Sequence, residues 1–258
     1  GCFEQTSSTT YPNVLVLDFL RRSRTSSPAL ETKARAFIDD GYQKLVAFEV
    51  TGGGLDWFGR GQAHSVLSAY GLFEFHDMAK IRPIDEAMLE RTRGFLWSTQ
   101  RPDGSWAAPS HGVGSTGSVA DDATGATAYI AWALAESGDA DPRLARALDY
   151  VEHQKDSDPY ALALSGLALA AGGRAGPASA RVRRLARAAV RGGGLAHWHS
   201  ERRGLTQGYG QSLDVETTAF AAHLSARTGG DPALRREALA WLAAARDARG
   251  LWPSTSAT

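Results

Sequence analysis

Two side chains near the start of the chain could together form a reactive bond. Cys2 is the only cysteine among 258 residues, so it cannot form a disulfide within the chain. Gln5 follows three residues later, and its side-chain carbonyl carbon could fold back onto the Cys2 sulfur. Attack by the sulfur with loss of ammonia would leave an intramolecular thioester. A lone cysteine can also be a small packing residue, and the residue types alone leave that alternative open.

A thioester between these residues would be an acylating agent. Sulfur donates its lone pair to a carbonyl poorly and thiolate is a good leaving group, so the Gln5 carbonyl carbon would be more electrophilic than in an amide. Residues 6–12 are rich in serine and threonine and are expected to cap a helix over residues 14–20. A Cys2 sulfur near the N-terminus of that helix would leave more readily as thiolate.

Composition narrows the classes of function. The chain is 43% hydrophobic and 22% charged, as in an ordinary globular protein. Its 28 basic and 28 acidic residues give a net charge of zero, which argues against a nucleic-acid-binding protein because such proteins need a basic face. No apolar run approaches the roughly 20 residues that span a bilayer, so no membrane span is expected.

The ends and the composition of the chain indicate its context. The sequence begins directly on Gly1 and Cys2, without methionine or leader, so we expect residues 1–258 to form a single domain excised from a larger multidomain protein. Arginine is preferred over lysine and alanine is abundant, which is typical of a bacterial coding sequence.

Helical periodicity dominates the rest of the chain. Helices are predicted at residues 14–20, 29–50, 62–75, 84–97, 124–135, 143–151, 160–171, 180–190, 215–224 and 234–245. Segments that are apolar nearly all round alternate with amphipathic ones, which indicates an inner and an outer layer of helices. Glycine-containing turns recur with Trp57, Trp106, Trp198 and Trp252, at spacings of about 50 residues or a multiple of it. We therefore predict an all-α fold, an α/α toroid of about six helical hairpins with essentially no sheet core. An open helical solenoid is the alternative.

The first five residues resemble the signature of a known family. Gly1-Cys2-Phe3-Glu4-Gln5 is similar to the Gly-Cys-x-Glu-Gln thioester motif of the alpha-2-macroglobulin and complement proteins. Weaker similarities follow in order at residues 11–20, 41–43, 100–104, 215–219 and 253–258. Phe3 replaces the glycine of the vertebrate motif, which favours a bacterial homologue, and Ser256 replaces a glutamine. The chain stops where the resemblance places the last helix, so the toroid is expected to lack its closing helix.

The resemblance implies a function as well as a fold. It implies a thioester domain that covalently captures proteases or target surfaces by acyl transfer from a Cys2–Gln5 bond, as macroglobulin-type protease traps do. Such a reaction is used once, so we expect neither an enzyme nor a cofactor. The resemblance also implies contacts with neighbouring domains of the parent chain and an extracytoplasmic location, which could be periplasmic, cell-surface or secreted.

A histidine would direct this chemistry. His111 follows the Pro102-Asp103-Gly104 turn, and the resemblance implies that it attacks the thioester to give an acyl-imidazole. The freed thiolate would then serve as base for an incoming hydroxyl group. The spacing from the turn to His111 is shorter than in the complement-type proteins by a few residues.

Water competes with the intended nucleophile, so a thioester must be shielded until it is used. Aromatic residues in or near turns are the candidates for this shield, and ordinary packing explains each of them equally well. They are Tyr11, Trp57, Phe58, Trp106 and Tyr209.

Two other functions remain open. Asp121 and Asp122 could be the paired carboxylates of an α/α-toroid glycoside hydrolase or a terpene cyclase-like enzyme, although helix capping explains them more simply. The chain could also be an interaction module with an inactive thioester.

The remaining histidines give weaker signals. His197 and His199 could offer two metal ligands, but no cysteine or carboxylate pair at ligand spacing joins them, so no metal site is predicted. His64 and His223 lie in apolar segments and are expected to be hydrogen-bonded core histidines.

Overall fold

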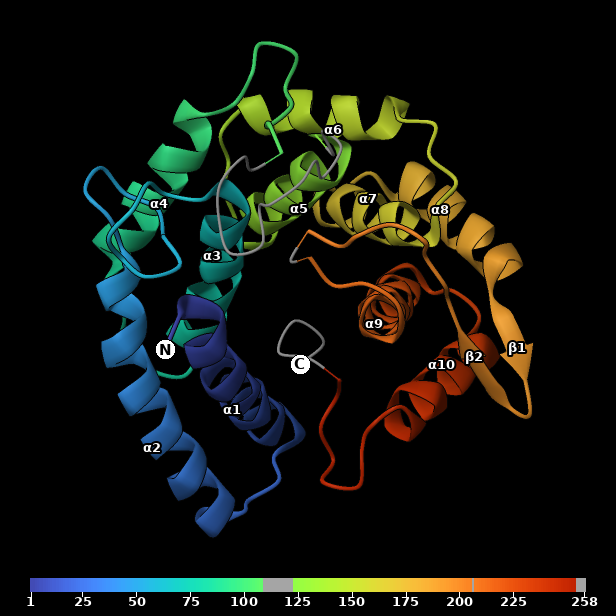
Figure 1. Ribbon diagram of the computed structural model, residues 1–258, viewed down its shortest axis with the longest axis horizontal. Helices are drawn as coiled ribbons and strands as arrows, with labels where there is room; N and C mark the ends of the chain where they lie inside the picture. Colours follow the sequence, from blue (N-terminus) through green and yellow to red (C-terminus); the bar gives the residue numbers. More distant parts are fainter. Residues whose placement is uncertain (109–122, 206, 254–258) are drawn as a thin grey trace. The chain divides into compact units, whose positions relative to one another are not determined.

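A computed structural model provides the structure of the chain (Figure 1), and the residues that it describes are 1–108, 123–205 and 207–253. They belong to two compact units. The first unit comprises residues 1–99, and the second comprises the described residues from 100 onward.

The first unit is built from helical hairpins. Its elements are α1 (Phe3–Ser23), α2 (Pro28–Leu45), the short 3₁₀ helix η1 (Val46–Phe48), α3 (Ser65–Ala79) and α4 (Glu86–Ser98). Figure 1 shows α1 and α2 side by side, joined by a short turn. A long loop over residues 49–64 joins η1 to α3 and returns the chain to the start of α1.

The second unit repeats this arrangement and adds a small hairpin. Its elements are α5 (Ala123–Glu136), α6 (Arg143–His153), α7 (Pro159–Ala171), α8 (Ala175–Ala188), β1 (Val190–Gly192), β2 (Leu195–His197), α9 (Gln211–Thr228) and α10 (Pro232–Ala244). The two three-residue strands pair antiparallel, with Val190 opposite His197. Helix α7 lies at the centre of this unit and packs against α5, α8 and α9.

The fraction of buried residues differs between the helices predicted to be inner and those predicted to be outer. In α7, ten of 13 residues are buried, whereas only two of the 14 residues of α8 are. The same contrast separates α3, with ten of 15 residues buried, from α4, with five of 13. An all-α fold of paired inner and outer helices is thus confirmed for the described residues, with a sheet limited to the short β1–β2 hairpin.

One hydrogen bond recurs where the chain returns to an inner helix. The Leu55 N–H donates to Ser68 Oγ of α3 at 2.8 Å. In the second unit, the Trp106 N–H donates to Thr127 Oγ1 of α5 at 2.9 Å, and the Trp198 N–H donates to Thr218 Oγ1 of α9 at 3.2 Å. In each case a buried serine or threonine of the helix accepts from a buried backbone donor of the incoming turn.

Helix α1 begins earlier than the sequence predicts. We expect a helix over residues 14–20, but the helix starts at Phe3 and contains Pro12. Four of the five hydroxyl groups in residues 6–10 bond to carbonyls within the helix, as when Thr6 Oγ1 donates to the Cys2 carbonyl at 3.0 Å and Thr10 Oγ1 donates to the Thr6 carbonyl at 2.9 Å. Bonds of this kind let serine and threonine lie inside a helix. Burial of Phe3 on the same face then favours a helix from the first residues onward.

Helices α1 and α2 approach each other at Gly41. A Cβ atom at Gly41 would lie 2.0 Å from Thr10 Oγ1, and the Thr10 side chain is buried. Because Thr10 is fixed by its bond to the Thr6 carbonyl, it cannot move aside without loss of that bond. Only glycine fits at this crossing.

The contact at Gly41 predicts a loss of stability on a minimal substitution. Gly41→Ala should lower the free energy of unfolding by about 1–3 kcal/mol, because an added methyl group overpacks the crossing. Gly94→Ala in α4 is the matched control, since nothing lies within 4 Å of a Cβ atom there. It should raise the free energy of unfolding by about 0.5–1 kcal/mol. Urea unfolding followed by circular dichroism measures both changes, and equal effects would contradict the close approach.

Candidate functional site

Cys2 and Gln5 meet at the N-terminus of α1. Cys2 is the N-cap residue, with extended backbone angles (φ −90°, ψ 172°), and Gln5 is the third residue of the helix. The Cys2 N–H donates to Gln5 Oε1 at 3.2 Å. The Cys2 side chain faces the Gln5 N–H in the same capping box, without reaching the geometry of a side-chain hydrogen bond. Cys2 therefore lies at the positive end of a 21-residue helix, and the Gln5 side chain folds back onto the Cys2 backbone N–H.

Phe3 anchors this turn to the core of the first unit. Its side chain has no exposed surface, and its ring makes edge contacts with Phe48 and Tyr70 at centroid distances of 5.6 and 6.0 Å. The Phe3 N–H donates to the Trp57 carbonyl at 3.0 Å. Cys2 is half-buried and Gln5 is exposed. The turn is therefore fixed on its inner side by Phe3 and accessible to solvent on its outer side.

The loop that holds Phe3 is itself held by a buried carboxylate. Asp56 Oδ2 accepts N–H bonds from Phe58, Arg60 and Gly61 at 3.1, 3.2 and 3.1 Å. Burial alone would raise the pKa of Asp56, but these backbone bonds stabilise the charged form and hold its pKa below the ordinary value. Asp56 thereby fixes the loop conformation that presents the Trp57 carbonyl to the helix N-terminus.

A buried polar cluster lies on the inner face of α1. Ser7 Oγ lies 2.5 Å from Glu74 Oε2 and 2.8 Å from the Tyr70 hydroxyl, and both partners belong to α3. Burial raises the pKa of Glu74 to about 8, although the bond from Ser7 lowers it in part. Burial and the nearby Glu74 carboxyl group also raise the pKa of Tyr70. Glu74 is therefore mostly uncharged at neutral pH.

Of the predicted shield residues outside α1, Trp57 contacts the motif, and it does so through its backbone carbonyl. Trp57 contacts Phe3 through its carbonyl, and its ring packs edge-on to His64 at 5.7 Å. Tyr11 lies on α1 itself and donates a hydrogen bond to Asp77 Oδ2 at 2.7 Å. Phe58, in the same loop as Trp57, is 57% exposed.

The other predicted site residues are not joined to the motif. Trp106 and Tyr209 belong to the second unit, where Trp106 is buried and Tyr209 is 67% exposed. His111, Asp121 and Asp122 lie outside the described residues. The roles assigned to all five residues stay predictions.

The remaining histidines have partners of other kinds. His197 stacks on Trp241 with ring centroids 4.8 Å apart. His199 Nδ1 lies 2.9 Å from Asp214 Oδ1, a carboxylate that sequence spacing does not associate with it because the two are 15 residues apart. Among the described residues, no group of three histidine, cysteine or acidic side chains could hold a metal ion.

The two predicted core histidines differ. His64 is buried and is the N-cap residue of α3, where its Nδ1 accepts the Leu67 N–H at 3.1 Å. The prediction for His223 is wrong, because this residue is exposed on α9. Its ring lies beside Trp132, with the centroids 6.0 Å apart.

Sequence reasoning missed the polar residues that support the motif. Ser7 follows Gln5 by two residues, and Glu74 interrupts the apolar run of α3. A carboxylate inside a helix that is apolar nearly all round is a signal in itself, because such a group needs a buried partner. The sequence does not reveal which partner, since 67 residues separate Ser7 from Glu74.

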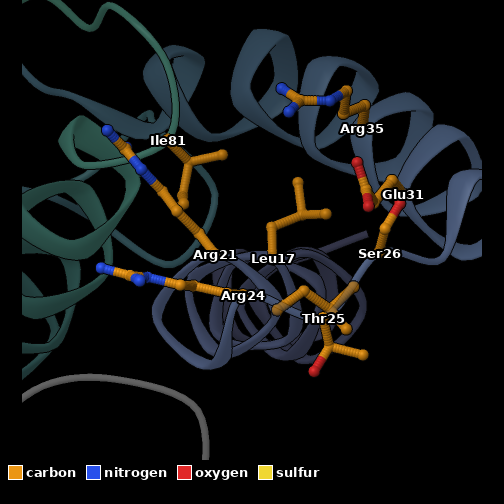
Figure 2. A pocket seen from close by; sticks show the side chains of 9 residues that line it. Leu17, Arg21, Arg24, Thr25, Ser26, Glu31, Arg35 and Ile81 are labelled. Atoms are coloured by element: carbon orange, nitrogen blue, oxygen red, sulfur yellow. The ribbon is translucent and has the colours of Figure 1, made fainter.

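A groove of about 410 Å³ lies at the opposite end of α1. Figure 2 shows Leu17 pointing into it from α1, with Ile81 and Arg35 across the opening and Glu31 at one side. Arg21, in the last turn of α1, and Arg24, its C-cap residue, extend toward the side away from Glu31. The length of α1 separates this groove from Cys2 and Gln5, so it is not part of the candidate site.

Comparisons with known proteins place the chain in a family. A family model described as the A-macroglobulin TED domain matches residues 1–258. The chain belongs to this family. Ovostatin from Gallus gallus is 25% identical over 223 residues, which are 81% of this chain and 15% of ovostatin. The TED domain therefore corresponds to a small part of that relative.

The family match covers both compact units of this TED domain. Across residues 1–108, 123–205 and 207–253, none of its helices has the length and hydropathy that a membrane crossing requires.

The Asp56 carboxylate predicts a pH-dependent stability difference. Asp56→Asn should lower the free energy of unfolding by about 1–3 kcal/mol at pH 7, because three N–H groups lose a charged acceptor. The pKa of Asp56 is lowered by folding, so its contribution is present above the ordinary value of 3.8 and is lost as the pH falls through the folded-state value.

The two proteins should therefore converge in stability in acid. Urea unfolding at pH 7 and at pH 3 measures this difference. Asp40→Asn is the matched control, since Asp40 is exposed and forms a surface pair with Lys44 that contributes little. A difference that is unchanged at pH 3 would show that the charge of Asp56 is not what holds the loop.

Proposed function

We propose that this TED domain forms a thioester between Cys2 Sγ and Gln5 Cδ and uses it to capture proteases or target surfaces covalently. The observation that carries the proposal is the bond from the Cys2 N–H to Gln5 Oε1. A donor on this oxygen polarises the carbonyl group that the sulfur must attack. The same N–H would stabilise the oxyanion of the tetrahedral intermediate.

The capping box supplies the groups for bond formation. The Cys2 sulfur attacks Gln5 Cδ, so that a carbon–sulfur bond forms while the carbon–nitrogen bond of the side-chain amide breaks. The amide nitrogen leaves as ammonia and takes up the thiol proton. Cys2 and Gln5 are already close at the end of one helix, so ring closure orders few additional residues.

In the capture step, Gln5 Cδ is again the atom attacked, but the Cys2 sulfur is now the leaving group. A hydroxyl or amine of the target attacks Gln5 Cδ, the new ester or amide bond forms, and the carbon–sulfur bond breaks. The electron pair leaves with the Cys2 sulfur as a thiolate, which the N-terminus of α1 stabilises and which can take up the proton that the target hydroxyl or amine loses. Each domain acts once, so it is a covalent trap rather than an enzyme.

The family supports the wider setting of this proposal. The chain spans 15% of ovostatin, so the TED domain would work within a much longer protein whose neighbouring domains control access to the bond. We infer proteases or target surfaces as partners and an extracytoplasmic location, whether periplasmic, cell-surface or secreted. A bacterial source remains a prediction from composition and from Phe3.

The thioester predicts a defined response to a small amine. In the intact parent protein, Cys2 should not react with a thiol reagent until methylamine is added. Methylamine should then release one thiol per chain and leave a methylamide at Gln5. Thiol titration and peptide mass spectrometry measure the two products.

Matched glutamine variants make this test specific. Gln5→Asn shortens the side chain by one methylene and should abolish the masked thiol, whereas Gln62→Asn, at an exposed position, should leave it unchanged. A Cys2 thiol that reacts fully before methylamine, with no adduct at Gln5 afterwards, would end the thioester proposal.

We further propose that His111 directs the thioester toward hydroxyl groups. His111→Asn should reduce acylation of glycerol by about 100-fold while methylamine still reacts, because an amine needs no histidine to become a nucleophile. His153→Asn, at an exposed position on α6, is the control and should preserve both reactions. An unchanged ratio of glycerol to methylamine reactivity in His111→Asn would remove this residue from the mechanism.

A further inference from the structure

The thioester helix is tied to its neighbour by a short polar contact. Ser7 on α1 and Glu74 on α3 have no exposed surface, and 2.5 Å separates Ser7 Oγ from Glu74 Oε2. Ser7 comes two residues after Gln5, in the turn of α1 that follows the motif. The contact therefore acts on the part of the helix that carries the reactive groups.

We propose that Glu74 is a positioning residue for the thioester, which fixes the rotation of α1 through Ser7 and so holds Cys2 and Gln5 in register. Apolar contacts around Phe3 oppose withdrawal of the helix but are not directional. A hydrogen bond weakens steeply as it bends, so the Ser7–Glu74 contact restricts rotation about the helix axis. This inference rests on the proposed function, although the contact can be tested without it.

The proton count shows why the contact persists in both charge states of Glu74. The Ser7 hydroxyl faces two oxygens, at 2.5 Å on Glu74 and 2.8 Å on Tyr70, and it has one proton to donate. With Glu74 charged, Tyr70 donates to Ser7 and Ser7 donates to Glu74. With Glu74 neutral, the bonds reverse and Glu74 donates to Ser7.

The charged state is nevertheless disfavoured. Glu74 Oε1 is buried and has no hydrogen-bond partner among the described residues, so a carboxylate there would be incompletely paired. Burial accordingly raises the pKa of Glu74 to about 8. Ionisation would weaken the docking of α1, because a partly opened helix would let water reach the charge.

The neighbouring charges do not offset this cost. On α1, Glu4 acts on Tyr70 and raises its pKa further. On α4, which also packs against α3, Arg91 pairs with Glu49 and Arg93 pairs with Glu90. Both arginines of α4 are thus engaged with other acids.

The pKa of Glu74 gives the contact a pH dependence of known sign. It is higher in the docked helix than its ordinary value of 4.5, so the docked state binds more protons. Docking should weaken as the pH rises from about 4.5 to about 8 and should level off above that. The equilibrium constant for opening of α1 should change by at most about tenfold per pH unit.

The test compares the parent protein with three of its variants. Glu74→Gln keeps an uncharged hydrogen-bonding group, Glu74→Leu removes it, and Glu86→Gln on the exposed start of α4 is the control. Hydrogen-exchange protection factors of peptides from α1 are measured from pH 5 to pH 9. The rate at which Cys2 thiol appears in buffer at pH 6.5 reports hydrolysis of the thioester.

The positioning role predicts a distinct result for each variant. Protection of α1 should fall with pH in the wild type and in Glu86→Gln, but stay constant in Glu74→Gln. Hydrolysis at pH 6.5 should be unchanged in Glu74→Gln and at least about tenfold faster in Glu74→Leu, as expected for the loss of one buried hydrogen bond. If Glu74→Leu does not fold, Ser7→Ala removes the same bond from α1.

The outcomes separate this inference from the proposed function. A pH dependence in Glu74→Gln that equals that of the wild type would overturn the role of Glu74, as would unchanged hydrolysis in both Glu74→Leu and Ser7→Ala. A wild-type protein with no thioester would overturn the proposed function. In that case the protection factors of α1 would still decide whether Glu74 holds the helix.

Discussion

The burial of Phe3 is the constraint on which the reactive end of the molecule depends. A thioester motif at a chain segment with no anchor would have many conformations, and few of them would place a sulfur beside an amide carbon. The Phe3 ring packs against Phe48 and Tyr70, and its N–H is bound by the Trp57 carbonyl. The residues on either side of Phe3 are then left on the accessible surface with little freedom. An apolar residue inside the motif thus positions the polar ones.

The supports of this turn come from three segments far apart in the sequence. The loop over residues 49–64 contributes the Trp57 carbonyl, which Asp56 fixes by binding three backbone N–H groups. Helix α2 contributes the close crossing at Gly41, and α3 contributes Glu74. Each contact acts on the same face of α1. Together they convert an ordinary helix N-terminus into a defined site for Cys2 and Gln5.

The sequence predicts most of the architecture and the centre of the site, but not its supports. Alternation of apolar and amphipathic segments reflects burial, so the helices and their two layers follow from it. The start of α1 cannot be predicted in this way. Serine and threonine in residues 6–10 indicate a helix cap, and only the burial of Phe3 shows that the helix begins before them. The Cys2–Gln5 pair is local and can be found by spacing. Contacts such as Ser7–Glu74 join residues far apart in the sequence, so they cannot be predicted from a periodic pattern.

The exposure of Gln5 bears on how the proposed trap would stay loaded. A thioester carbonyl open to water is hydrolysed, yet within the first unit Phe3 and the Trp57 loop cover only the inner side of the motif. The contacts described here dock α1 and so keep water from the inner side of the proposed bond, but they leave its outer side open. Protection of the outer side therefore has to be supplied separately from positioning. A covalent trap benefits from this separation, because removal of a cover can release full reactivity without any change in the groups that perform the chemistry.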